Sequence, residues 1–436
     1  MTIDNKPAIL GGKPIFDKQF EPYRTIGIEE QKAVEKVMKS GKLSGYLGAW
    51  SPEFYGGSKV RELENHWAEY FNVKHAIVVN SWTSGLYAIL GAIGLEPGDE
   101  VLVTPTTMTA SVAGIVLYQA IPIFVDIDPD TYCIDPKEIL KKITNKTKAI
   151  IGVNIYGETA DWDLINEIAI KNNIITIEDA AQSIGGLYNN IKSGTLADVG
   201  GYSLNRHKHI HCGEGGVCVT NNDEIAERIR LIRNHGEAVV ADKGTKDIRN
   251  IIGFNFRMTE LEASIAIEQL KKLERLVDKR ISTCKKIIKA FTSFEGISYP
   301  KLYSGTSITT KHVYYYLCFN FDPLKVGISR KAFVASMKAE GIPLGEGGYI
   351  PVYLQPMYQR KIAFGSKGHP FTADYYGKEI SYPKGLCPVA EKMWFKQLFY
   401  FEIQNFSPNE EQVKNFNNAI NKVLKNKEEI NNKFKE

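Results

Sequence analysis

The feature that most constrains the fold is an alternation of short apolar runs with longer amphipathic stretches, which begins near residue 76. Helical stretches such as SGLYAILGAIG and DWDLINEIAIKNN separate the apolar runs. This alternation predicts an α/β fold with a mainly parallel sheet flanked by helices on both faces. Ligands of such sheets bind at the carboxyl ends of the strands, so the residues after each strand are the first functional candidates. The predicted strands are short and rich in Val and Ile, as buried strands are: HAIVVN, DEVLVTP, IPIFVDID, KAIIGVN and NIITIEDA.

Two segments that follow predicted strands carry polar residues suited to a charged ligand. In NSWTSGLYAIL a strand ends at Asn80, and a helix begins with Ser81, Thr83 and Ser84. Free N–H groups at a helix start bind anions, although the same residues also form a plain N-cap. Asp179 follows the strand IITIE, where its carboxylate could pair with a protonated ring nitrogen or cap the next helix. Neither segment identifies a ligand by itself.

A third segment, YSLNRHKHIHCGEGGVCVT at residues 202–220, places Lys208 among three histidines. If this stretch were a strand, His207, His209 and His211 would share one face, but recognised zinc spacings are wider and usually include Cys or a distant ligand. A nucleic-acid surface needs a clustered basic face, whereas the net charge is only +4 over 436 residues. A lysine that forms a Schiff base with a carbonyl cofactor needs a phosphate site and an acid for the ring nitrogen. Both precede Lys208 in the sequence, so the three segments together fit pyridoxal 5'-phosphate (PLP), and we expect no metal.

Composition and terminal sequence bear on the compartment. The six cysteines are scattered without a CxxC pair, which indicates reduced thiols. The start MTIDNKPAILGGKPIF lacks the basic residues and apolar run of a signal peptide, and no apolar stretch is long enough to span a bilayer. We therefore expect a cytoplasmic protein with no membrane or nucleic-acid partner.

The length of the chain and a helical pattern after Arg257 predict two domains. From Arg257 to about Phe291 the pattern keeps one apolar face, and strand-like KHVYYYLCFNF follows it. We predict a large domain over residues 1–270 and a smaller C-terminal α/β domain over residues 271–436. A closing helix should begin with Ser407 as N-cap and Pro408 at its first position, and the Lys/Asn/Glu-rich tail beyond it should be solvated.

Four motifs in order, NSWTSGL, DAAQSIGG, SLNRHKHIHCGEGGV and GFNFRMTELEASI, resemble the DegT/DnrJ/StrS family of PLP-dependent sugar aminotransferases. The resemblance extends from AILGGKP, near residue 8, to CPVAEKM at residues 387–393, and so covers most of the chain. It implies the fold type I architecture, with a large PLP-binding domain and a smaller C-terminal domain. It also implies a homodimer whose active sites use both chains.

The resemblance assigns a role to each matching residue. Lys208 lies five residues before Gly213, as the family's Schiff-base lysine lies before its GEGG turn. One branch of the family has histidine there and catalyses dehydration, so Lys208 favours transamination over the alternative of a sugar dehydratase. Asp179 matches the acid that pairs with the pyridinium nitrogen. Gln182 matches a residue near the cofactor's phenolic oxygen, and Thr83, Ser84 and Ser203 match residues that bind its phosphate. Asn255 matches an asparagine that reaches the neighbouring subunit's site, although it could equally be a helix-terminal residue without a ligand.

The chain also departs from the family pattern at three positions. Trp82 stands where many members have glycine, just before the phosphate-binding threonine. Thr109, with Met108 beside it, occupies the position where many members place an aromatic ring over the cofactor. Tyr353 replaces a frequent histidine, which predicts an altered substrate pocket.

The activity implied by the resemblance is the transfer of an amino group from glutamate, or glutamine, to a keto-sugar. Most members act on nucleotide-linked sugars that enter surface polysaccharides or secondary metabolites. An AILGG-type start also occurs in relatives that handle cyclitols, which leaves a keto-cyclitol as an alternative acceptor. A cofactor-binding regulator without catalysis is a further alternative, against which the intact GEGG and NFR motifs argue.

Overall fold

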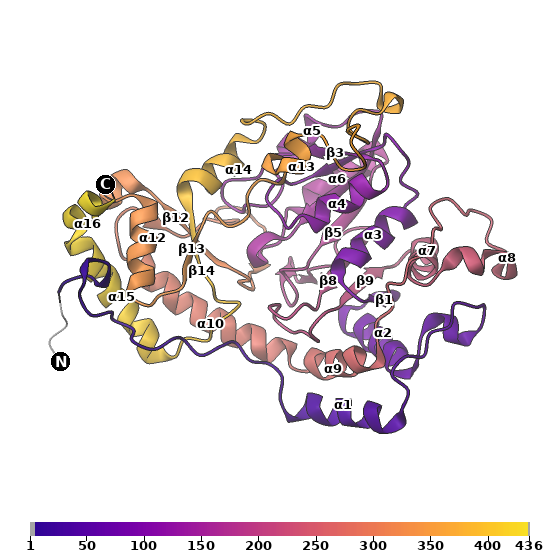
Figure 1. Cartoon of the computed structure of the whole chain (residues 1–436), viewed down its shortest axis with the longest axis horizontal. Helices are drawn as coiled ribbons and strands as arrows, with labels where there is room; N and C mark the ends of the chain where they lie inside the picture. Colours follow the sequence, from indigo (N-terminus) through magenta and orange to yellow (C-terminus); the bar gives the residue numbers. More distant parts are fainter. Residues whose placement is uncertain (1–4, 435–436) are drawn as a thin grey trace.

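The computed structural model of the chain describes residues 5–434, and its central element is a seven-stranded sheet in the order β1-β9-β8-β5-β4-β2-β3 (Figure 1). All strands run parallel except β9, which pairs antiparallel with both β1 and β8. The five predicted strands all belong to this sheet, so the predicted mainly parallel α/β fold is confirmed. The strands are β1 (His75–Val79), β2 (Glu100–Val103), β3 (Ile121–Phe124), β4 (Thr147–Val153), β5 (Ile175–Asp179), β8 (Val199–Ser203) and β9 (Gly216–Thr220).

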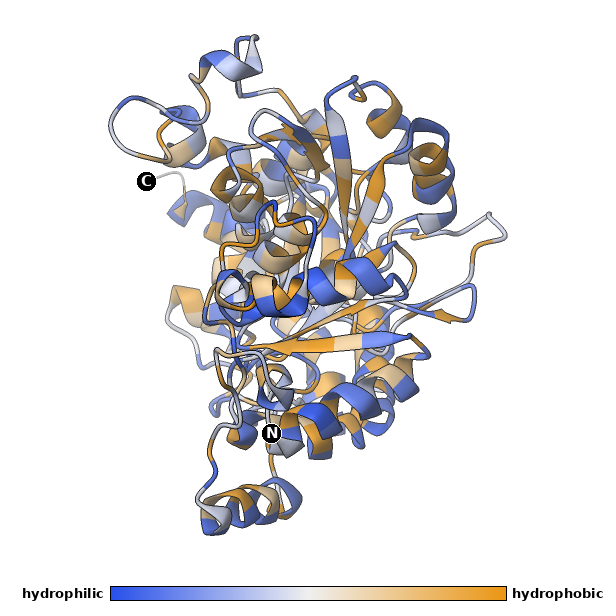
Figure 2. Ribbon diagram, turned by 90° about the vertical axis from the view of Figure 1, so that its right-hand side faces the viewer, coloured by the Kyte–Doolittle hydropathy of each residue, from blue (hydrophilic) through white to orange (hydrophobic). Residues whose placement is uncertain are grey.

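Each face of this sheet packs against its own hydrophobic core, because successive side chains of a strand point to opposite faces. In β1, Ile77 and Val79 belong to one buried cluster and Ala76 and Val78 to another. Apolar residues therefore dominate the strands, while polar residues mark the outer sides of the helices (Figure 2). The first cluster includes residues of α3 (Trp82–Ala92), α4 (Ala110–Leu117), α6 (Trp162–Asn172) and α7 (Asp223–Arg233), and the second includes residues of α2 (Ser58–Phe71) and α9 (Glu260–Leu270).

A second, four-stranded antiparallel sheet in the order β10-β12-β14-β13 has a separate aromatic core. The N-terminal segment runs along this part of the molecule, beside the C-terminal helices (Figure 1), and Phe20 is buried in its core. The boundary predicted between residues 270 and 271 stays a prediction. The elements are β10 (Ile297–Ser298), β12 (Leu317–Phe321), β13 (Leu344–Glu346), β14 (Leu398–Phe401), α10 (Leu273–Phe291), α12 (Arg330–Ala339), α15 (Glu410–Lys425) and α16 (Lys427–Lys433).

The helix predicted as continuous from Arg257 to Phe291 is two helices, α9 and α10, with a break at residues 271–272. The segment contains no Gly or Pro that would mark a break. Instead, Lys272 forms ion pairs with Glu29 at 3.0 Å and Glu30 at 2.7 Å, both in α1 (Ile28–Ser40). The break is therefore associated with a tertiary contact that the local sequence does not reveal.

The predicted start of the closing helix was wrong. Its N-cap is Asn409, whose side chain accepts a hydrogen bond from Gln412 N at 2.9 Å in a capping box. Ser407 instead donates its backbone N–H to Glu21 O at 2.8 Å, which holds it outside the helix. The tail predicted to be solvated forms the helix α16, whose residues are exposed or half-buried apart from Ile430, which packs into the second core.

The remaining elements are short or peripheral. A three-stranded sheet in the order β11-β6-β7 lies apart from the two larger sheets. Within residues 5–434, no helix is long and apolar enough to cross a membrane. These elements are β6 (Leu187–Tyr188), β7 (Ile191–Lys192), β11 (Thr310–Lys311), α5 (Pro136–Leu140), α8 (Val240–Lys243), α11 (Pro323–Val326), α13 (Pro356–Gln359) and α14 (Pro388–Lys392).

Candidate active site

The fold brings the three motif segments to one edge of the seven-stranded sheet. Strands β1, β5 and β8 run in the same direction, so their carboxyl ends meet at this edge. Asp179 is the last residue of β5, Ser203 is the last residue of β8, and Ser81 follows β1 as the N-cap of α3. Lys208 lies in the irregular segment between β8 and β9. The predicted site residues other than Asn255 therefore lie in or directly after strands of one sheet edge.

Asp179 is buried and held by three donors. The indole Nε1 of Trp82 donates to its Oδ1 at 2.7 Å, and the backbone N of Ala181 donates to the same oxygen at 3.1 Å. The hydroxyl of Ser111, in α4, donates to Oδ2 at 2.7 Å. Burial raises the pKa of Asp179, while the Ser111, Ala181 and Trp82 donors and the charge of Lys208 lower it. The carboxylate is thus desolvated but supplied with donors that favour its ionised form.

Lys208 is also buried, with 7% of its surface exposed. Among the described residues its Nζ makes no hydrogen bond or ion pair, and it lies 4.4 Å from the centre of the Tyr315 ring. Burial lowers the pKa of Lys208 to about 8, against an opposing effect of the Asp179 charge. A buried amine with a lowered pKa and no partner is suited to act as a nucleophile or to exchange protons near neutral pH.

The start of α3 has the geometry of an anion site. Ser81 caps the helix by accepting a hydrogen bond from Ser84 N at 3.1 Å, and its hydroxyl lies 2.9 Å from Ser84 Oγ. Thr83 and Ser84 occupy the first turn, where N–H groups lack intrahelical acceptors and the helix dipole favours a negative charge. Ser203 lies at the same edge, and its hydroxyl accepts a hydrogen bond from Asn205 N at 3.3 Å.

Gln182 links the edge of the sheet to a group of tyrosines. Its Oε1 accepts a hydrogen bond from Tyr156 N at 2.8 Å, and its Nε2 donates to Tyr349 OH at 3.0 Å. The Tyr349 ring is stacked on those of Tyr156 and Tyr316, with both pairs of centroids 6.1 Å apart. Gln182 is therefore held in a fixed orientation beside these three stacked tyrosines, Tyr156, Tyr316 and Tyr349, which we call the aromatic wall.

Asn255 differs from the other predicted residues because it is exposed. Its carbonyl accepts a hydrogen bond from Asn80 Nδ2 at 3.3 Å, and its side-chain Oδ1 accepts one from Arg257 Nε at 2.8 Å. It is therefore next to Asn80, the residue that directly follows β1.

The histidines around Lys208 do not lie on a strand, so they do not have the shared face that a strand would give them. Residues 204–212 are irregular, and His209 is buried with its Nε2 2.8 Å from Val313 O. Burial lowers the pKa of His207 to about 4. Within the described ranges no group of three or more His, Cys, Asp and Glu side chains could hold a metal ion.

The expectation that Tyr353 alters the substrate pocket stays a prediction. Tyr353 is fully buried, and its hydroxyl bonds to the carboxylate of Glu391 and accepts a hydrogen bond from Cys387 N at 3.1 Å. Glu391 is in α14. Tyr353 belongs to the core on one face of the seven-stranded sheet, and its ring centroid lies 5.4 Å from that of Phe124 in β3.

At the position expected to cover the cofactor, Met108 is 54% exposed, and its Sδ accepts a hydrogen bond from Thr109 Oγ1 at 3.2 Å. Two residues of the site were not predicted from the sequence: Ser111, which donates to Asp179, and Tyr315, whose ring contacts the Lys208 amine. Ser111 could have been found as a hydroxyl residue shortly after a predicted strand, in the same way as Thr83 and Ser84. No local signal places Tyr315 near Lys208, since more than 100 residues separate them in the sequence.

The donors and acceptors at this edge match those that PLP requires. Lys208 offers an amine that has no hydrogen bond or ion pair among the described residues, and a helix start with adjacent hydroxyls offers an anion site. A carboxylate oxygen accepts about two hydrogen bonds. Asp179 Oδ1 has two donors and Oδ2 has one, so Oδ2 keeps an acceptor position for a protonated ring nitrogen.

Comparisons with known proteins agree with this chemistry. GDP-perosamine synthase of Caulobacter vibrioides is 38% identical over 232 residues, which are 53% of this chain and 60% of that protein. A putative L-glutamine:3-amino-2,3-dideoxy-scyllo-inosose aminotransferase of Micromonospora echinospora is 26% identical over 423 residues, 97% of each chain. The X-ray structure of S. venezuelae DesV in complex with a ketimine intermediate superimposes with a TM-score of 0.74 at 26% identity, covering 91% of this chain and 94% of that one.

A family model also matches most of the chain. The model described as the DegT/DnrJ/EryC1/StrS aminotransferase family matches residues 25–386, a range that contains every predicted site residue. The resemblance and the fold expected from it are thereby confirmed. The chain belongs to the DegT/DnrJ/EryC1/StrS aminotransferase family.

Proposed function

We propose that this chain is a PLP-dependent aminotransferase that moves an amino group from glutamate or glutamine to a nucleotide-linked keto-sugar. The observation that carries the proposal is the buried amine of Lys208, which has no hydrogen bond or ion pair among the described residues. A lysine with a purely structural role would be expected to pair its charge when buried.

Bound PLP supplies an electron sink that stabilises negative charge at the carbon next to the amino nitrogen. Lys208 holds the cofactor and, once released, carries a proton between the donor's α-carbon and the cofactor carbon. Its lowered pKa of about 8 lets the amine both accept and return that proton near neutral pH. Asp179 would keep the ring nitrogen protonated, and Gln182 would lie beside the phenolic oxygen. Thr83, Ser84 and Ser203 bind the phosphate at the start of α3.

The acceptor is proposed from the relatives and from the aromatic wall beside Gln182. The similarity to GDP-perosamine synthase supports a nucleotide-linked sugar, whose ring could pack on the stacked tyrosines. A keto-cyclitol is the second candidate, because the Micromonospora echinospora relative aligns over 97% of each chain. That relative's name also makes glutamine the donor to test beside glutamate.

We further propose a homodimer in which Asn255 contributes to the active site of the neighbouring subunit. Its exposure and its position beside Asn80 support this role. Light scattering would measure the oligomeric state. Mixing Lys208→Ala with Asn255→Ala protein should restore part of the turnover if the sites are shared, because one hybrid site keeps both residues. An absence of restoration in a proven mixed dimer would contradict sharing.

The first test of the function is the visible absorption spectrum of the protein with PLP, before and after addition of glutamate or glutamine. A cofactor band that bleaches with the donor and returns with the matching oxo-acid supports an aminotransferase. Acceptor panels of nucleotide-linked keto-sugars and keto-inositols, read by mass spectrometry, then separate the two candidate acceptors. Borohydride reduction should attach the cofactor to the peptide that contains Lys208, and Lys171→Ala, at an exposed lysine, is the control. No band at any PLP concentration would contradict the proposal.

A further inference from the structure

Trp82 makes a contact that its place in the sequence does not predict. As the first residue of α3 it directs its side chain to Asp179, and its Nε1 lies 2.7 Å from Oδ1. Both residues are buried, with 5% and 4% of their surfaces exposed. An indole N–H can only donate, so this hydrogen bond has one possible polarity. A hydrogen bond from a neutral donor to a buried carboxylate is among the stronger ones in proteins.

Two glycines, Gly201 and Gly85, line the slot that holds the Trp82 side chain, and a third, Gly216, packs against the Trp82 backbone. A Cβ atom at Gly201 would lie 2.2 Å from Trp82 Cζ3, and one at Gly85 would lie 2.9 Å from Cε3. A Cβ at Gly216 would lie 2.6 Å from the Trp82 backbone N. These distances are too short for any side chain, so the slot leaves the indole little freedom to turn away from Asp179.

The donors around Asp179 distinguish its two oxygens. Oδ1 accepts from both Trp82 and Ala181, whereas Oδ2 accepts from Ser111 alone. The Ser111 hydroxyl is itself 2.9 Å from Thr107 Oγ1, which can supply the donor that lets Ser111 point its own proton at Asp179. With about two acceptor positions per oxygen, Oδ1 is filled and Oδ2 keeps one.

We infer that Trp82 is a positioning residue, whose indole N–H fills Oδ1, keeps the buried Asp179 carboxylate ionised and leaves Oδ2 to face the cofactor's ring nitrogen. The inference rests on the proposed pairing of Asp179 with that nitrogen. A carboxylate with more donors is a weaker base, so the shared proton stays on the ring nitrogen rather than moving to Asp179. Loss of the indole donor makes Asp179 more basic and shifts this proton toward the carboxylate.

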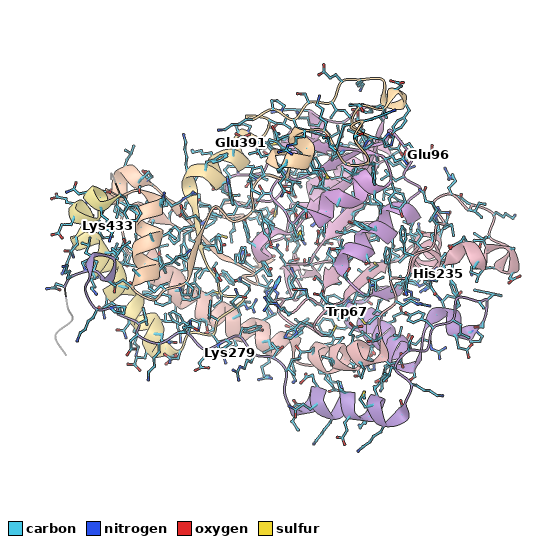
Figure 3. All side chains as sticks on the ribbon, in the orientation of Figure 1. Trp67, Glu96, His235, Lys279, Glu391 and Lys433 are labelled. Carbon is cyan, nitrogen blue, oxygen red and sulfur yellow. The ribbon has the colours of Figure 1, made fainter. Side chains whose placement is uncertain are left out.

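The test compares Trp82→Phe with a matched control, Trp67→Phe. Trp67 is fully buried in α2 (Figure 3), and its Nε1 has no hydrogen-bond partner in the described part of the chain. Both substitutions exchange a buried indole for a phenyl ring, but only the first removes a hydrogen bond. Benzothienylalanine at position 82, in which sulfur replaces the N–H, removes the same bond while it keeps the shape of the ring. This second variant decides the matter if Trp82→Phe fails to fold.

Three measurements separate positioning from simple packing. The ¹⁵N shift of labelled PLP should show less ring-nitrogen protonation in the position-82 variants, and PLP affinity should fall about tenfold. Infrared spectra of the cofactor-free protein should show Asp179 taking up its proton at a higher pH. Trp67→Phe should leave all three unchanged. The inference would be overturned if the position-82 variants matched Trp67→Phe in all three measurements. The proposed function would still stand in that case if the wild type binds PLP. If the wild type does not bind PLP, the proposed function fails, and with it the pairing of Asp179 with the ring nitrogen. The infrared titration of Asp179 still decides whether Trp82 keeps this carboxylate ionised.

Discussion

The molecule contains two buried arrangements of a lysine with an acid. In one, the closed pair, the two charges form an ion pair, whereas in the other, the open site, they do not. Glu340 and Lys422, in the C-terminal part, lie 3.1 Å apart with side chains that are 0% and 2% exposed. Glu340 also accepts hydrogen bonds from Ala8 N at 2.7 Å and Ile15 N at 2.9 Å. Every charge in this pair has a partner, and the pair ties the N-terminal segment to α12 and α15.

Asp179 and Lys208 share the same chemistry without forming an ion pair. Asp179 keeps one acceptor position, and Lys208 faces an aromatic ring instead of a carboxylate. Unused hydrogen-bonding capacity in a buried site costs stability, and functional sites are where proteins retain it. The contrast therefore separates a structural charge pair from a reactive one, although both are buried lysine–acid arrangements.

The largest effect is expected from Lys208→Ala, which should reduce turnover by at least about 10³-fold, since the same amine holds the cofactor and moves the proton. The melting temperature of the cofactor-free protein should not fall, because the substitution removes a desolvated amine without a partner. Turnover assays and thermal unfolding measure the two effects. Full retained activity would show that Lys208 is not the reactive group.

The converse pattern is expected for Lys422→Met. Removing one member of a buried ion pair leaves the Glu340 carboxylate uncompensated and should cost about 3–5 kcal/mol in the free energy of unfolding. Turnover per folded molecule should stay the same, because the pair lies outside the proposed site. Denaturant unfolding and active-site titration provide the measurement. A loss below about 1 kcal/mol would mean that the closed pair contributes little, and the contrast with Lys208 would weaken.

The open site should also show itself in its pH dependence. Neutral Lys208 is the form that captures PLP, and its pKa of about 8 implies a capture rate that falls about tenfold per pH unit below that value and levels off above it. In the unfolded chain the amine titrates near its ordinary pKa of about 10.5, so between these two values the unfolded state binds more protons. The stability of the cofactor-free protein therefore gains a rising contribution from Lys208 with pH across this window.

Stopped-flow absorbance after mixing with PLP gives the capture rate, and denaturant unfolding gives the stability. Lys208→Ala removes the stability contribution and serves as the control for that measurement. A capture rate that keeps rising tenfold per unit up to about pH 10 would show that burial does not lower the pKa of this amine.

Sequence patterns predicted five strands of the central sheet because these strands are short, apolar and separated by helices, and each of these signals is local. They also placed Asp179 and the start of the helix at Thr83 and Ser84 at one edge, because parallel strands align their carboxyl ends. Distant contacts were not predictable in this way. The break before α10 accompanies ion pairs from Lys272 to α1, and Tyr315 reaches Lys208 from the segment between β11 and β12. Trp82 was noticed only as an unusual residue, since nothing local shows that its indole meets Asp179.

The smallest effect concerns the packing beneath the open site. Gly85 lies in α3, where alanine would ordinarily stabilise a helix by about 1 kcal/mol. Here a Cβ would lie 2.9 Å from Trp82 Cε3 and 3.0 Å from Cys218 Sγ. Gly85→Ala should therefore destabilise the protein by about 1–3 kcal/mol, the usual cost of overpacking a core. Because the clash pushes on the indole, PLP affinity should fall as well.

The same substitution in a Trp82→Phe background tests whether the indole is the cause. Phenylalanine lacks the outer ring that the Cβ would meet, so Gly85→Ala should cost less there than in the wild type, and the two effects should not add. Denaturant unfolding of the four proteins in this cycle gives the coupling energy. If the costs add, the Cys218 contact alone opposes the alanine. The packing at Gly85 would then have no effect on the orientation of Trp82, and therefore none on the position of Asp179.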